Sequence, residues 1–281
     1  MNVTILGQGA MGARMADRLE DAGFAVVRWN RTGAVQTPAA AVRDADVVMA
    51  MVRDDAASRA VWAEGEGAAL AAMKPGAIAI ESSTVTPGWA RTLAGMAQAR
   101  GTAFLDAPVL GSRPQAEAGQ LIHLIGGEAD VIARVAPVLA AVGSARLHAG
   151  AAGAGAALKL VANALLAIQV AAVAELIGRM PGLGLCAETA IDLLGQTPVA
   201  SAAARGAAGL MLSGRDAPLF PVELVAKDLG YAVGDASSAM PITEAAIRVF
   251  ARAKAAGLAD ANLTAVSQLY AKAGAPEPMK A

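Results

Sequence analysis

The sequence has little of the residues that build disulfide scaffolds and metal centres. Among 281 residues there is one cysteine, Cys186, and there are two histidines, His123 and His148. One cysteine excludes an internal disulfide framework and a multi-cysteine metal site, and two isolated histidines do not suggest zinc. Aromatic residues make up only 3% of the chain against 56% hydrophobic residues in all, which favours close packing of alanine-rich helices.

The chain also lacks an excess of charge of either sign. Its 23 basic and 24 acidic residues give a net charge of −1, which argues against partners such as nucleic acid or an anionic membrane. The most apolar run, 160–174, is shorter than the roughly 20 apolar residues that span a bilayer, so we expect a buried helix there. The chain opens directly on a strand pattern with no signal peptide, so we expect a cytoplasmic protein.

The most informative motif follows the first apolar run, 3–6. Gly7, Gly9 and Gly12 stand at G-x-G-x-x-G spacing before an amphipathic helix that ends near Gly23. The first glycine permits a tight turn, the second lets the backbone approach a pyrophosphate, and the third allows helix and strand to pack closely. The phosphates are then expected at the N-terminus of the helix. The motif predicts a dinucleotide-binding domain.

The end of the second strand, 25–29, indicates which dinucleotide binds. Chains that bind NAD usually carry Asp or Glu there, bonded to the ribose 2′-hydroxyl, whereas this chain has Asn30, Arg31 and Thr32. A carboxylate would repel a 2′-phosphate, and a guanidinium beside a hydroxyl would bind it. The alternative is an ordinary solvated turn. We expect the cofactor to be NADP rather than NAD.

Strand and helix patterns alternate through the first half, which predicts an α/β class: a Rossmann doubly wound, mostly parallel sheet over 1–151. From 152 to 281 the pattern is all-α and begins with a long helix, 152–179. We expect the active site between these two domains, and a frayed tail at 275–279. Thr86-Pro87 has the composition of a helix start. The expected strands are 3–6, 25–29, 46–51, 77–81, 103–109 and 121–125, and the expected helices include 54–63, 86–99 and 129–142.

Two polar segments follow strands in this first half. Thr84 follows the fourth strand, where an open α/β sheet binds its ligands, and it could equally cap a helix. Gly111-Ser112 follows a strand that ends at Val109, and we expect this turn to leave backbone N–H groups open for a carboxylate. A purely structural turn would have the same pattern.

A lysine on the long helix could supply the proton chemistry. Lys159 and Asn163 are four residues apart and share one helix face, and Gly155 leaves space one turn before the lysine. An ammonium among Ala, Leu and Val either snorkels to the surface or has a function that offsets the cost of its burial. Hydride transfer to a carbonyl leaves charge on the oxygen, which an ammonium can stabilise and protonate.

Taken together, these segments resemble the β-hydroxyacid dehydrogenase family, which includes 3-hydroxyisobutyrate dehydrogenases and glyoxylate/succinic semialdehyde reductases. The resemblance extends over nearly the whole chain and is carried by motifs that occur in the expected order. They are the Gly7–Gly12 turn with Met11 and Met15, Asp106-Ala-Pro-Val109, Gly153-x-Gly155-x-x-x-Lys159-x-x-x-Asn163, and Phe220 with Lys227-Asp228-Leu229.

The resemblance implies roles for the matching residues. Lys159 would be the catalytic general acid and base, and Asn163 would position the substrate beside it. Asn30-Arg31-Thr32 is similar to the NADP-preferring branch, and family members associate as dimers or tetramers through the all-α domain. The implied cofactor contacts are Gly7, Gly9, Ala10, Met11, Gly12, Asn30, Arg31, Thr32, Met51, Val52, Thr84 and Lys227. The implied substrate contacts are Leu110, Gly111, Ser112, Phe220 and Asp228.

Two departures from the family pattern concern the substrate, which we expect to be a small hydroxy acid, oxo acid or semialdehyde. Leu110 stands where the family usually has a serine that helps to hold the substrate carboxylate, and Ser112 could partly replace it. Ala162 stands where relatives often have an asparagine. Leu110 leaves an imine reductase open as an alternative, although Lys159 argues against it. A 6-phosphogluconate dehydrogenase and a catalytically silent NADP-binding module are further alternatives.

Overall fold

The computed structural model describes residues 1–214, 217–234 and 240–271. They form two compact units, which divide between Lys159 and Leu160. The expected tail at 275–279 lies outside the described residues.

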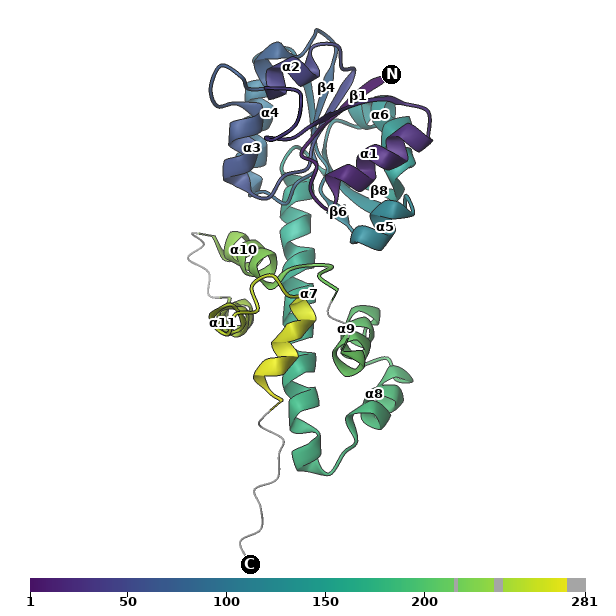
Figure 1. Cartoon of the computed structure of the whole chain (residues 1–281), viewed down its shortest axis with the longest axis vertical. Helices are drawn as coiled ribbons and strands as arrows, with labels where there is room; N and C mark the ends of the chain where they lie inside the picture. The colour runs from purple at the N-terminus through teal and green to yellow at the C-terminus, as the bar shows by residue number, and fades with distance from the viewer. Residues whose placement is uncertain (215–216, 235–239, 272–281) are drawn as a thin grey trace, which may run out of the picture. The chain divides into compact units, whose positions relative to one another are not determined.

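The first unit is built on one eight-stranded sheet, shown with its helices in Figure 1. The order along the sheet is β2-β1-β3-β4-β5-β7-β6, and β8 also pairs with β7. The pairs from β2 to β5 are parallel, whereas β7 is antiparallel to β5 and β6. The strands are β1 Asn2–Leu6, β2 Ala25–Trp29, β3 Val47–Ala50, β4 Ile78–Glu81, β5 Ala103–Asp106, β6 Val109–Leu110, β7 Leu121–Gly127 and β8 Gly143–Gly150.

Helices cover both faces of this sheet. Successive strand residues point to opposite sides, and the residues on each side are apolar and need to be covered. Val47 and Met49 pack in the core beneath α1, α5 and α6, whereas Val48 and Ala50 pack in the core beneath α2, α3 and α4. The predicted doubly wound α/β fold is confirmed. The helices of this unit are α1 Gly12–Asp21, α2 Pro38–Val42, α3 Asp55–Trp62, η1 Leu70–Ala72, α4 Pro87–Gln98, α5 Arg113–Glu117, α6 Ala129–Val142 and the start of α7, Ala154–Arg179.

The structure differs from the sequence-based expectation in two strands. The strand expected over 103–109 is broken into β5 and β6, because Pro108 lies between them and has no N–H to donate to a ladder. The strand β8 was not expected. It pairs with β7 on one side, and most of its side chains are exposed, so it lacks the apolar run that marks the buried strands.

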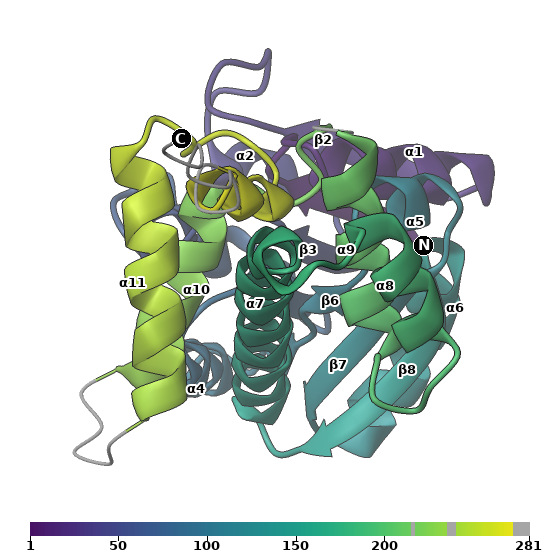
Figure 2. The same cartoon turned by 90° about the horizontal axis from the view of Figure 1, so that it is seen from below.

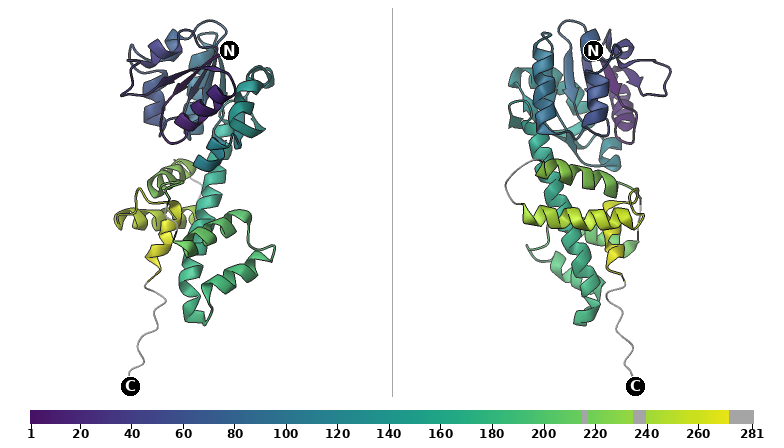
Figure 3. Two further views of the ribbon diagram at one scale, coloured as in Figure 1. Left: turned by 45° about the vertical axis from the view of Figure 1, so that its right-hand side comes forward. Right: turned by 90° about the vertical axis from the view of Figure 1, so that its left-hand side faces the viewer.

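The second unit consists of helices around α7. In Figure 2, α10 and α11 lie on one side of α7 and α8 and α9 on the other, and the views in Figure 3 agree. Its core joins α7, α9, α10, α11 and η3 around Val170, Val225 and Phe250. The elements that follow α7 are η2 Pro181–Leu183, α8 Ala187–Gly195, α9 Ala202–Ser213, α10 Val222–Val233, α11 Pro241–Ala255 and η3 Leu263–Leu269.

The helix α7 is less buried than the sequence suggested. Leu158, Val161, Leu165 and Leu176 are all exposed along one side of it. Within the described part of the chain it is also the one helix that is long and apolar enough to cross a membrane, by length and composition. Core helices of soluble proteins pass the same test, so a single such helix is weak evidence for a membrane span.

Candidate active site

The glycine turn after β1 has the geometry that its spacing predicts. Gly7 has a φ of +110°, and its N–H donates to the Trp29 carbonyl at 2.9 Å, which ties the turn to β2. A Cβ placed on Gly12 would lie 2.0 Å from the Gly7 carbonyl oxygen, so only glycine allows α1 to start so close to the strand. A Cβ on Gly9 would meet nothing within 4 Å. The backbone at Gly9 is therefore open to a ligand.

The start of α1 suits an anion. The helix begins at Gly12, its N-cap residue Met11 provides no side-chain cap, and its first turn has no acidic residue. Ala10 beside it is exposed. Uncapped N–H groups and the positive end of the helix dipole attract phosphate.

The polar residues 30–32 directly follow Trp29, whose carbonyl accepts the Gly7 N–H. Arg31 and Thr32 are exposed. The Asn30 Oδ1 atom is buried and receives no hydrogen bond from the described residues. A buried acceptor without a donor is costly, and a ribose hydroxyl is one group that could donate to it. The open backbone at Gly9, the uncapped helix start and this acceptor together fit a dinucleotide.

The turns after β3 and β4 meet at the same sheet edge. The Val52 N–H donates to Ser83 Oγ at 2.8 Å, and the Met51 carbonyl packs so closely on Gly7 that no Cβ fits there. Thr84 is half-buried, and the cap of α4 is supplied by Thr86, whose Oγ1 accepts the Trp89 N–H. The structure thus brings Met51 and Val52 against the glycine turn.

A buried carboxyl at the end of β4 escaped the sequence analysis. Glu81 has no exposed surface, and it accepts hydrogen bonds from Ser58, Trp62 and the Ser83 N–H. Burial raises the pKa of Glu81, and these donated hydrogen bonds act against that rise. An acidic residue in the otherwise apolar run 77–81 was the available signal.

The start of α7 is held by a second buried carboxyl, Asp106, at the end of β5. Its two oxygens accept the N–H groups of Gly153 and Ala156, each at 2.7 Å. Burial raises the pKa of Asp106, against the effect of these backbone hydrogen bonds. The sequence suggested that Gly155 leaves space beside Lys159, but the structure gives this glycine another role. A Cβ there would lie within 3 Å of the Leu124 carbonyl, so Gly155 lets α7 approach β7.

Lys159 and Asn163 both lie on α7 and are both buried, with 9% and 4% of their surfaces exposed. The Asn163 side-chain amide donates to Asp228 Oδ2 at 2.6 Å. The other oxygen of Asp228 pairs with the Lys227 ammonium at 2.8 Å, and that ammonium also lies 4.7 Å from the centre of the Tyr231 ring. One hydrogen bond and one ion pair therefore join three of the predicted site residues within the helical unit.

Phe220 is held in the same unit but in a different way. Its N–H donates to Asn262 Oδ1 at 3.1 Å, and its carbonyl accepts the Leu263 N–H at 2.8 Å. The phenyl ring is half-buried and packs on the core of the unit.

The turn at Leu110-Gly111-Ser112 corrects one expectation. Gly111 has a φ of +115°, but the Ser112 N–H donates to Gln115 Oε1 at 2.9 Å, as the N-cap of α5. This N–H is thus taken up by the capping box, because the first N–H groups of a helix need acceptors. The prediction that the turn leaves both N–H groups open is wrong for Ser112.

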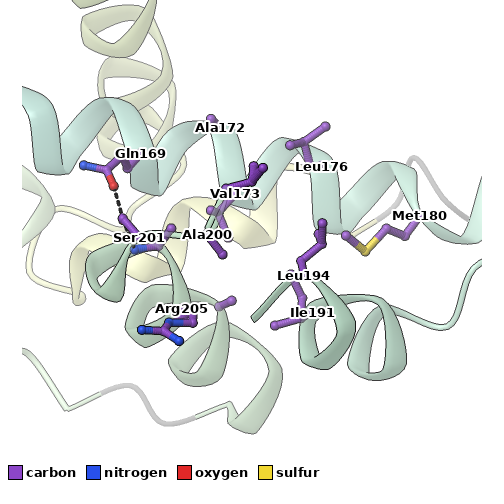
Figure 4. Close-up of a pocket in the computed structure, with 13 residues that line it drawn as sticks. Gln169, Ala172, Val173, Leu176, Met180, Ile191, Leu194, Ala200, Ser201 and Arg205 are labelled. Carbon is purple, nitrogen blue, oxygen red and sulfur yellow. Dashed lines mark hydrogen bonds between the residues drawn. The ribbon is translucent and has the colours of Figure 1, made fainter. Parts of the chain in front are cut away.

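An apolar pocket in the helical unit is lined by none of these residues. A pocket of about 230 Å³ lies between α7 and the pair α8–α9. Figure 4 shows Val173, Leu176, Ile191 and Leu194 around it, with the Gln169–Ser201 hydrogen bond at one end. The described residues contain no group of three His, Cys, Asp or Glu side chains that could hold a metal ion.

Comparisons with known families match both halves of the chain. Residues 2–151 match the family described as the NAD binding domain of 6-phosphogluconate dehydrogenase. Residues 153–270 match the family described as NAD-binding of NADP-dependent 3-hydroxyisobutyrate dehydrogenase.

Three relatives illustrate the range of the similarity. Glyoxylate/succinic semialdehyde reductase 2, chloroplastic, of Arabidopsis thaliana is 31% identical over 95% of this chain and 78% of that protein. A probable 3-hydroxyisobutyrate dehydrogenase of Mycobacterium bovis is 34% identical over 68% of each chain. The cytokine-like nuclear factor N-PAC of Mus musculus is 30% identical over 95% of this chain but only 50% of that protein.

Solved structures show the same similarity. The 3-hydroxyisobutyrate dehydrogenase of Mycobacterium tuberculosis, solved with L-serine, is 30% identical with a TM-score of 0.87, over 95% of this chain and 98% of that one. A reductive aminase of Aspergillus terreus, solved with NADPH and ethyl levulinate, is 24% identical with a TM-score of 0.56, over 96% of this chain and 99% of that one. At that identity the likeness to the aminase shows the fold alone.

Proposed function

The chain belongs to the β-hydroxyacid dehydrogenase family, and from that premise we propose that it is an NADP(H)-dependent oxidoreductase with Lys159 as its catalytic acid and base. Its substrate would be a short β-hydroxy acid, or the corresponding semialdehyde or oxo acid. The observation that carries the proposal is the burial of the Lys159 side chain, only 9% exposed, on the same face of α7 as Asn163.

The cofactor proposal concerns the edge of the sheet at β1, β2 and β3. Bound NADP(H) would accept or supply the hydride. The open backbone at Gly9 and the uncapped start of α1 would hold its pyrophosphate. Arg31 and Thr32, both exposed after β2, would bind the 2′-phosphate, since a planar guanidinium binds phosphate with two parallel hydrogen bonds. No carboxylate stands at 30–32 to repel it.

The remaining cofactor contacts are proposed from the neighbouring turns and from the helical unit. Met51 and Val52 would border the dinucleotide, because they lie against Gly7. Thr84 and the Lys227 ammonium would contact it as well. The cofactor contacts proposed as a set are Gly7, Gly9, Ala10, Met11, Gly12, Asn30, Arg31, Thr32, Met51, Val52, Thr84 and Lys227.

The proton chemistry would fall to Lys159. In the direction of reduction its ammonium would donate a proton to the substrate oxygen, and in oxidation the neutral amine would accept it. Asn163 would bind the substrate next to it. Because the Asn163 amide already donates to Asp228, the orientation of this side chain is set before substrate arrives. Asp228 would thus have two roles: it would orient Asn163, and it would itself border the substrate.

The substrate class is proposed from the relatives and from the β6–α5 turn. The similar enzymes are named for glyoxylate, succinic semialdehyde and 3-hydroxyisobutyrate, which share a carboxylate. Gly111, Ser112 and Phe220 would border this substrate together with Leu110. A leucine at 110 offers no hydrogen bond to a carboxylate, so we expect a substrate with a larger or more apolar body.

A silent NADP-binding module is the second candidate, because one relative that aligns over 95% of this chain is named a nuclear factor. The Lys159→Ala variant separates the two candidates. If the protein is an enzyme, the rate of NADPH oxidation by Lys159→Ala should be several orders of magnitude below that of wild type. The substrate panel is glyoxylate, succinic semialdehyde, tartronate semialdehyde and a cyclic imine. The affinity for NADPH, measured by fluorescence titration, should be unchanged. Wild-type protein that binds NADPH but reduces no member of the panel supports the module, and preference for the imine supports an imine reductase.

We also propose that the protein is a cytoplasmic homo-oligomer, a dimer or a tetramer, joined through the helical unit. Val161 and Leu165 stand out from α7, and α8 buries none of its residues. The same unit carries the apolar pocket beside α7 (Figure 4). A surface that offers both an apolar ridge and an apolar hollow suits a second copy, because a two-fold interface uses one patch twice.

A further inference from the structure

Glu81 is an unusual last residue for a buried strand. The other residues of β4, Ile78 to Ile80, are buried and apolar, and Glu81 follows them with no exposed surface. Removing a carboxyl group from water is costly unless hydrogen bonds replace the lost hydration. A carboxyl group in such a place needs hydrogen-bond donors. The elements that carry these donors are the parts of the fold that the carboxyl group holds together.

Three groups donate to Glu81. The Ser83 N–H donates to Oε1 at 2.8 Å, while the Trp62 indole N–H, at 2.9 Å, and the Ser58 hydroxyl donate to Oε2. The direction of the Ser58 bond follows from Trp89, whose indole N–H donates to Ser58 Oγ at 2.8 Å. The single hydroxyl proton of Ser58 is then left for Glu81. All three neighbours therefore need an acceptor at Glu81.

The two oxygens of Glu81 face different parts of the unit. Oε2 is bonded to side chains of α3, whereas Oε1 holds the backbone of the turn after β4. The same Ser83 accepts the Val52 N–H through its hydroxyl, at 2.8 Å. Next to Val52, the Met51 carbonyl lies against Gly7 in the glycine turn. A continuous set of contacts runs from the buried carboxyl to the turn expected to bind pyrophosphate.

We propose that Glu81 is a positioning residue of the nucleotide site. Through Ser83 it fixes the turns after β3 and β4 in the arrangement that the dinucleotide needs, and it does not itself touch the cofactor. This inference rests on the proposed cofactor site. Its physical basis is preorganisation: a turn already held in its bound shape loses less conformational freedom when the ligand binds.

The substitution Glu81→Gln tests the role with little change of volume. The one amide oxygen can serve Ser58 and Trp62, and the NH₂ group then faces the Ser83 N–H, donor against donor. The hydrogen bond to Ser83 is lost and the turn is released. We expect the Kd of NADPH, measured by fluorescence titration, to rise about tenfold or more, as for one lost hydrogen bond to a charged group.

Ser83→Ala and Ser58→Ala form the matched pair that keeps the test informative if Glu81→Gln folds poorly. Each removes one hydroxyl from the same cluster, but only Ser83 is bonded to Val52. We expect Ser83→Ala to weaken NADPH binding about as much as Glu81→Gln. Ser58→Ala should lower Tm while leaving the Kd within about twofold of wild type.

Two results would overturn the inference. One is wild-type NADPH affinity in both Glu81→Gln and Ser83→Ala. The other is an equal loss of affinity in Ser58→Ala and Ser83→Ala at equal loss of Tm, which would make the cluster merely structural. Because the readout is binding, failure of the catalytic proposal is separate. A wild-type protein that binds NADPH but reduces no member of the substrate panel counts against the enzyme, and the role of Glu81 in NADPH binding is still tested by the variants.

Discussion

Replacement of Gly9 by alanine should separate binding from stability. Gly9 is not among the glycines with positive φ, and a Cβ there would meet nothing within 4 Å. The folded state therefore accepts alanine without strain. Since alanine has fewer unfolded conformations than glycine, the Gly9→Ala variant should gain about 0.4–1 kcal/mol in free energy of unfolding.

The same methyl group should weaken the cofactor complex. If the pyrophosphate lies on the backbone of this turn, a Cβ at position 9 separates it from the N–H groups. The loss of one hydrogen bond to a charged group costs about 1.5–3 kcal/mol, which is about a tenfold to a hundredfold rise in the Kd of NADPH.

Gly12→Ala is the contrasting variant. Its Cβ would lie 2.0 Å from the Gly7 carbonyl oxygen, and backbone cannot move aside as a side chain can. We expect a loss of about 1–3 kcal/mol or more in stability, as for overpacked cores. Urea denaturation measures both stabilities, and fluorescence titration measures NADPH binding. A Gly9→Ala protein that binds NADPH as tightly as wild type would show that the phosphates do not lie on this turn.

Three further predictions concern other parts of the chain. Arg31→Asp should shift cofactor preference from NADPH toward NADH, because a carboxylate repels a 2′-phosphate; an unchanged ratio of kcat/KM for the two cofactors would contradict the role of Arg31. Burial, and to a smaller extent Arg146, lowers the pKa of His123 from 6.5 to about 4. Between these pH values the unfolded chain binds a proton that the folded chain excludes, so stability should fall by up to about 3 kcal/mol as pH drops from 6.5 to 4. Urea titrations at several pH values should show a flatter dependence in His123→Gln, and equal slopes would refute the assignment. Leu165→Glu, on the exposed side of α7, should produce monomers in analytical ultracentrifugation, and an unchanged sedimentation coefficient would place the interface elsewhere.

The sequence was sufficient for the features that depend on local spacing. Apolar runs predicted β1, β3 and β4, because buried parallel strands need apolar side chains on both faces. The G-x-G-x-x-G spacing predicted the turn at Gly7 and the close approach at Gly12, since both depend on the absence of a Cβ. The family resemblance was confirmed by the family models that match residues 2–151 and 153–270. By contrast, β8 has largely exposed side chains and no apolar run, and only its pairing with β7 identifies it.

What the sequence determined alone is therefore the alternation of strands and helices from β1 to α4, the glycine turn, and the candidate residues that follow from the motifs. The tertiary structure decided which polar groups meet. The bonds of Glu81 to α3, of Asp106 to the start of α7, and of Asn163 to Asp228 join residues on separate elements. Hydrogen bonds of this kind depend on atomic positions within a few tenths of an ångström. The packing of helices on the sheet and on each other sets these positions, and a sequence pattern does not encode them.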